Sequence, residues 1–188
     1  MAQEFAVTIE WVPFELHPET PPEGLVRDPN RPIMKPAVRD YLVLLAEDGG
    51  IGMRSATVMP NGRHPLEATE WARDQGVAAF DTLHRALFRA YFGEGRNIST
   101  VDQVVAVAEE ARLDGAALRR ALESGAYRAR VQEATTAMRA LGITSTPTYL
   151  FEDRYMVVGA QDDALFADVL RRLGVPRRAD AAPRPAAE

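Results

Sequence analysis

Residues able to carry covalent or metal chemistry are few in this sequence of 188 residues. Cysteine is absent, which excludes disulfides, thiolate catalysis and cysteine-bound metals from these residues. The three histidines, His17, His64 and His84, share no spacing typical of a metal site. No Gly-x-Ser-x-Gly motif or serine, histidine and aspartate grouping is recognisable either. We therefore expect neither a catalytic residue nor a metal site in these residues.

The charge balance narrows the class of partner. The net charge is -5, from 22 basic and 27 acidic residues. Nucleic acids and anionic membranes are bound by basic surfaces, so neither is expected as a partner. No apolar run approaches the roughly 20 residues that span a bilayer, and the first residues lack the pattern of a secretory signal. The sequence thus predicts a cytoplasmic protein.

The elements that would position a site begin with a β-rich segment. Residues 5–11 (FAVTIEW) alternate with period two, which predicts a strand. The proline-rich stretch 17–36 predicts an extended loop. A helical pattern follows over 37–46, opened by Pro36 and closed by Gly49-Gly50, and 51–59 is weakly extended.

The middle of the chain is predicted to be all helical, and its end β-rich again. The expected helices cover 66–75, 77–92, a segment opened by a capping box at Ser99 and Asp102, a segment capped by Asp114, and 126–141 before Gly142. The runs TYLF (148–151) and YMVV (155–158) predict a hairpin. Asp162 is expected to cap a last helix through Leu173, and 175–188 is too polar and proline-rich to pack.

Three stretches carry a family resemblance: WVPFELHPETPPEG (11–24), FRAYFGEGRNIS (88–99) and GITSTPTYLF…YMVVGAQ (142–161). With the order of elements, they make the sequence similar to the DsbA-type branch of the thioredoxin superfamily, from about residue 5 to 173. The resemblance implies an α/β fold with an inserted all-α domain. The thioredoxin-like core would comprise 5–63 and 143–174, the inserted helical domain 64–142, and a disordered tail 175–188.

The resemblance also implies a binding loop at Thr146 and Pro147. In thioredoxin folds the peptide bond before this proline is cis, and the preceding residue turns its N–H and C=O outward. Those groups can pair with an extended peptide or with the backbone of glutathione. From the residues alone, a trans proline that starts a strand is the favoured alternative, and it is the family pattern that favours the cis form.

Four more binding residues follow from the same resemblance. Asn61 and His64, in PNGRHP, fall where relatives have a turn at the mouth of the active site. Gln161 and Asp162 match the segment that meets the γ-glutamyl end of glutathione in the isomerase branch. Plainer roles stay open: a turn or cap for Asn61 and the N-cap of the last helix for Asp162.

What the resemblance does not supply is the thiol. In the family, a first strand and a helix opening with Cys-x-x-Cys precede the "W-x-P-F" strand, and this sequence begins at that strand. We therefore expect a core that is incomplete at its N-terminus, with two strand edges short of partners. A second copy of the chain or a strand-donating partner could complete the sheet.

Three functions remain in view. The first is a DsbA-family thiol–disulfide oxidoreductase that is redox-inactive as this chain but retains a loop binding a peptide or thiol compound. The second is a protein like the glutathione-dependent isomerases and transferases. The third is a non-catalytic binding or assembly partner. No cofactor is expected, although glutathione remains possible as a ligand.

Overall fold

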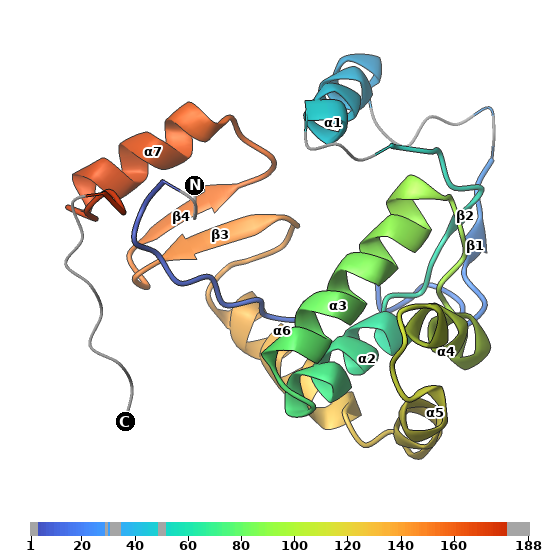
Figure 1. Ribbon diagram of the computed structural model, residues 1–188. Helices are drawn as coiled ribbons and strands as arrows, with labels where there is room; N and C mark the ends of the chain where they lie inside the picture. Colours follow the sequence, from blue (N-terminus) through green and yellow to red (C-terminus); the bar gives the residue numbers. More distant parts are fainter. Residues whose placement is uncertain (1–3, 29, 31–34, 49–51, 180–188) are drawn as a thin grey trace, which may run out of the picture. The chain divides into compact units, whose positions relative to one another are not determined.

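The computed structural model describes residues 4–28, 30, 35–48 and 52–179 (Figure 1). These residues form two compact units. We call Pro13–Thr144 the helical unit, and Met1–Val12 together with Ser145–Glu188 the sheet unit. No helix in the described ranges is both long and apolar enough to cross a membrane.

The helical unit is built around α2. Its elements are β1 (Leu25–Val26), α1 (Pro36–Asp48), β2 (Val58–Met59), α2 (Arg63–Asp74), α3 (Val77–Phe88), the π-helical turn η1 (Arg89–Gly93), α4 (Val101–Glu110), α5 (Gly115–Ser124) and α6 (Arg128–Ala140). Helix α2 packs against α3, α4, α5 and α6. Apolar side chains at helical spacing, including Trp71, Leu83, Val104 and Leu118, fill the core between them.

Most helix boundaries agree with the sequence pattern, and one cap does not. Asp114 accepts a hydrogen bond from the Ala117 N–H at 2.9 Å and starts α5, as predicted. The predicted cap at Ser99 is wrong, because Thr100 and Gln103 form the capping box of α4. The Ser99 hydroxyl is used elsewhere, since it donates to Asn97 Oδ1 and accepts from the Asn61 N–H.

The sheet unit contains the predicted hairpin and final helix. Strands β3 (Thr148–Phe151) and β4 (Tyr155–Val158) pair antiparallel, with Tyr149 opposite Val157. Helix α7 (Asp163–Arg172) covers one face, where the ring of Phe166 meets Tyr149 edge-on at 4.6 Å between centroids. This hairpin and helix confirm the predicted elements.

The predicted strand over 5–11 is wrong. Phe5 forms an isolated antiparallel bridge with Arg177, next to which the Ala6 N–H donates to the Pro176 carbonyl at 3.0 Å, and none of the described strands includes a residue of this segment. An alternating pattern yields a strand only where a neighbouring strand supplies hydrogen bonds, and β3 is paired to β4 alone. The same bridge orders residues predicted to be tail: the Arg178 N–H donates to the Glu4 carbonyl at 2.8 Å. Residues 180–188 lie outside the described ranges.

The segment 13–63 groups with the helical unit by its contacts. Two hydrogen bonds hold the start of this segment to α6. The Glu15 N–H donates to Thr135 Oγ1, and Arg139 donates to the Glu15 carbonyl, both at 3.0 Å. Helix α1 confirms the helix predicted over 37–46, while Gly49 and Gly50 lie outside the described residues. The division into a thioredoxin-like core (5–63 and 143–174) and an inserted helical domain (64–142) stays a prediction.

Candidate functional site

The loop before β3 holds the predicted binding residues Thr146 and Pro147. Both are exposed, and the peptide bond between them is cis. The loop is anchored on each side of Thr146: Thr148 Oγ1 donates to the Ser145 carbonyl at 2.7 Å, and the Gly159 N–H donates to the Pro147 carbonyl at 2.8 Å. Thr146 itself has no hydrogen-bond partner among the described residues. Its backbone N–H and C=O are therefore available to a ligand.

The register of the hairpin shows which other backbone N–H and C=O groups of β3 are free to bind a ligand. In an antiparallel pair, alternate residues direct both backbone groups toward the neighbouring strand. The bond from Gly159 to Pro147 fixes this alternation, so Tyr149 and Phe151 face β4. Thr148 and Leu150 then direct their backbone groups away from it. Thr146, Thr148 and Leu150 together form one edge that no described residue pairs with, and we call it the β3 edge.

Gln161 and Asp162 follow β4 in the same unit. Asp162 Oδ1 accepts from the Leu165 N–H at 2.9 Å, which makes it the N-cap of α7, as the plainer interpretation predicted. Gln161 Nε2 donates to the Val158 carbonyl at 2.9 Å. Both side chains are exposed and serve the local fold. Their assignment to ligand binding stays a prediction.

Asn61 belongs to the helical unit and is buried. Its Nδ2 donates to the Thr20 carbonyl at 2.6 Å, and its Oδ1 accepts from the Arg63 N–H at 2.9 Å. The Asn61 side chain thus ties the proline-rich loop to the start of α2. These contacts support the turn role, and substrate binding by Asn61 stays a prediction.

His64, the second residue of α2, lies beside the same network. Its Nδ1 is 2.7 Å from the Ser99 carbonyl oxygen, which can only accept, so Nδ1–H is the donor. Asn61 and His64 therefore share Ser99 as a partner. The structure brings these two predicted residues together within one unit, with Thr146, Pro147, Gln161 and Asp162 in the other. Within the described ranges, no cluster of three His, Asp or Glu side chains could hold a metal.

Sequence reasoning missed the buried acid Glu67. It is fully buried on α2, and neither carboxylate oxygen has a hydrogen-bond partner in the described structure. Burial raises the pKa of Glu67, because desolvation outweighs the attraction of Arg128, whose Nε lies 3.5 Å from Oε1. Its signal in the sequence is a glutamate among apolar residues at core spacing, in LEATEWA.

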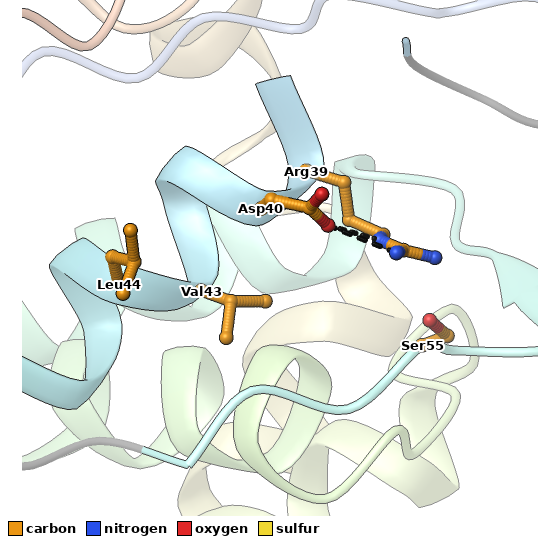
Figure 2. A pocket seen from close by; sticks show the side chains of 5 residues that line it. All are labelled: Arg39, Asp40, Val43, Leu44 and Ser55. Carbon is orange, nitrogen blue, oxygen red and sulfur yellow. Dashed lines mark hydrogen bonds and ion pairs between the residues drawn. The ribbon is translucent and has the colours of Figure 1, made fainter. Parts of the chain in front are cut away.

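A shallow hollow of about 490 Å³ lies beside α1, lined by Arg39, Asp40, Val43, Leu44 and Ser55. Figure 2 shows Arg39 bonded to Asp40 on the helix, with Val43 and Leu44 one turn further along. None of the residues predicted to bind a ligand lines this hollow. Its apolar wall belongs to a helix that packs little on the rest of the unit.

Comparison with known proteins agrees with this architecture. The uncharacterized protein YwbO of Bacillus subtilis (strain 168) is 30% identical over 162 residues, which cover 84% of this chain and 78% of YwbO. A probable DsbA oxidoreductase from Streptomyces coelicolor has a TM-score of 0.71 at 21% identity, over 93% of this chain and 77% of its own. A 2-hydroxychromene-2-carboxylate isomerase has a TM-score of 0.59 at 23% identity, over 73% and 66% of the two chains.

These structural likenesses establish the predicted α/β, thioredoxin-like fold. The sequence match extends nearly end to end, because the model of the DSBA-like thioredoxin domain covers residues 1–171. The chain therefore belongs to the DSBA-like thioredoxin domain family.

Proposed function

We propose that this chain is a DsbA-type protein that binds an extended peptide or a thiol compound at the β3 edge and performs no thiol–disulfide exchange by itself. The observation that carries the proposal is the unpartnered backbone of Thr146, in line with the outward groups of Thr148 and Leu150. Main-chain hydrogen bonds along such an edge bind extended peptides with little demand on their sequence. The absence of cysteine supports the redox-inactive part, since thiolate attack is the first step of disulfide exchange.

Binding at the β3 edge can be tested by NMR titration of the full chain. The probe is a short extended peptide, acetyl-Lys-Val-Thr-Val-Lys-amide, with the same peptide N-methylated at alternate residues as its matched control. We expect amide shifts at Thr146, Thr148 and Leu150 with the first peptide and none with the second. Equal binding of both peptides, or shifts that avoid all three residues, would contradict the proposal.

The redox part has its own assay. Reduction of insulin by dithiothreitol should proceed at the same rate with and without the chain, and acceleration by the chain would show that a group other than cysteine acts.

Titration with reduced glutathione tests the second candidate function, a protein like the glutathione-dependent isomerases and transferases. Shifts confined to Thr146, Gln161 and Asp162 would favour an isomerase-like or transferase-like ligand site, and no shift with glutathione would leave the peptide as the ligand. Recovery of a partner whose strand protects the β3 edge would favour an assembly role.

A further inference from the structure

A ladder of four rings runs along one face of α3 into η1. The ring centroids are separated by 5.3 Å from Phe80 to His84, 4.8 Å from His84 to Phe88, and 5.6 Å from Phe88 to Phe92. Phe80 is buried under the guanidinium of Arg73, but Phe88 and Phe92 are 51% and 41% exposed. Two exposed aromatic rings in contact form an apolar surface of the kind that interaction sites use.

Positive charge surrounds the exposed end of this ladder. Arg85 and Arg89 alternate with the rings on α3 and η1, and the N–H of Arg54 donates to the Phe92 carbonyl at 2.8 Å. The side chains of these three arginines are exposed and have no carboxylate partner in the described part of the chain. In a protein of net charge -5 this is a local reversal of sign. An apolar partner that carries acidic side chains would match it.

Helix α1 has those properties. Val38, Tyr41, Leu44 and Leu45 are exposed at helical spacing, with Leu44 at 64%. The sequence of α1 carries Arg39 against Asp40, Glu47 and Asp48, so it is acidic overall. The five helices α2, α3, α4, α5 and α6 pack against one another, and α1 takes no part in this packing. Its apolar face is thus exposed, as the faces of Phe88 and Phe92 are.

We propose that a second copy of the chain covers the ladder with its α1, and receives the first copy's α1 on its own ladder. A two-fold axis makes both contacts identical, so one complementary pair of faces closes a dimer. Each contact buries the aromatic rings of one copy under Tyr41, Leu44 and Leu45 of the other. The arginines around the rings then meet Glu47 of α1. This dimer does not depend on ligand binding at the β3 edge.

The first test is sedimentation velocity of the full chain from micromolar to submillimolar concentration. A dimer is expected, and Phe88→Ser and Leu44→Ser should each weaken it by about tenfold or more. Both positions are exposed, so circular dichroism should show an unchanged fold. Arg120→Glu, an exposed charge reversal on α5, is the matched control and should leave the dimer constant unchanged. A monomer at every concentration, or a dimer indifferent to Phe88→Ser and Leu44→Ser, would overturn the proposal.

Charge reversal gives a sharper test of the two-fold arrangement. Glu47→Arg and Arg89→Glu should each weaken the dimer, because both contacts of each homodimer then lose attraction. Mixing the two variants should restore a heterodimer, since one of its contacts is wild type and the other is reversed on both sides. Disulfide cross-linking tests the interface directly, because the chain has no cysteine of its own and only introduced cysteines can react. Leu44→Cys chains should form disulfides with Phe88→Cys chains and not with Arg120→Cys chains, and the opposite preference would exclude this interface.

Discussion

Arg128 Nε lies 3.5 Å from Glu67 Oε1, and this is the nearest charge to an acid that is otherwise enclosed by the core of the helical unit. Both Glu67 oxygens lack a hydrogen-bond partner in the described structure, and burial raises the pKa of the carboxyl group. A buried acid of this kind destabilises the fold when it ionises, because its desolvation is only partly offset by one half-exposed arginine.

Glu67→Gln should change how stability depends on pH. The folded pKa of Glu67 is raised above the ordinary glutamate value of 4.5 that the unfolded chain has. The protonated acid therefore contributes its full stability below that unfolded value, and this contribution is lost as pH rises through the folded pKa. Glu67→Gln removes the loss, so we expect the variant to gain about 1 kcal/mol over wild type at pH 7 and less near pH 4. Urea unfolding at both pH values measures this. Glu133→Gln, on the exposed face of α6, should show no such gain.

Asn61→Ala should destabilise the helical unit by about 2 kcal/mol. The substitution leaves the Thr20 carbonyl and the Arg63 N–H without their side-chain partners in a buried place. Chemical denaturation of the full chain measures the cost, and Asn30→Ala, at an exposed turn, serves as the control. If Asn61→Ala kept full stability and instead abolished ligand binding, the binding role predicted from the sequence would stand in place of the turn role.

Thr100→Ala should cost about 1 kcal/mol of stability, since it removes the hydroxyl that caps α4. Thr136→Ala is a matched control, because Thr136 is an exposed threonine within a helix whose hydroxyl donates to the Gln132 carbonyl. Thermal unfolding followed by circular dichroism compares the two variants. Equal losses from both would show that the Thr100 cap contributes nothing special.

Asp153→Gly should stabilise the β3–β4 hairpin by about 1 kcal/mol. The Arg154 N–H closes the turn onto the Phe151 carbonyl at 3.0 Å, with Glu152 and Asp153 both at positive φ, 49° and 54°. This geometry suits glycine at the second position, and an L side chain there is strained. Arg154→Gly, at the next residue, should lower stability instead, because it gains no relief of strain and adds chain entropy. Melting temperatures measure both effects. If the two substitutions shifted the melting temperature in the same direction, this account of the turn would be contradicted.

The sequence predicted the elements whose signals are local. Asp114 and Asp162 cap the helices expected of them, and TYLF and YMVV form their hairpin. The cap of α4 is Thr100 and not Ser99, because the Ser99 hydroxyl donates to Asn97 Oδ1 and accepts from the N–H of Asn61, which is its neighbour only in the folded chain. The segment 5–11 failed for the same kind of reason, since a strand depends on a neighbour that its own pattern cannot specify.

The candidate site was predictable to a lesser degree. Thr146 could be identified from the family pattern around Thr-Pro, and the structure adds which backbone groups along β3 face outward. The core spacing of Glu67 within LEATEWA indicates its burial, but the lack of a hydrogen-bond partner for both carboxylate oxygens could not be foreseen, because it depends on how α6 packs against α2. Nor could the exposure of Phe88 and Phe92, which have the spacing of core residues.

The bridge between Phe5 and Arg177 joins positions near the two ends of the described chain. The helical unit, by contrast, is one continuous stretch from Pro13 to Thr144. During synthesis on the ribosome, the helical unit is complete in sequence before β3 has been made. The sheet unit must wait for its last residues, and Phe5 stays without its partner until then. Folding should therefore proceed from the middle of the chain outward, with the closing of the termini as its slow, long-range step.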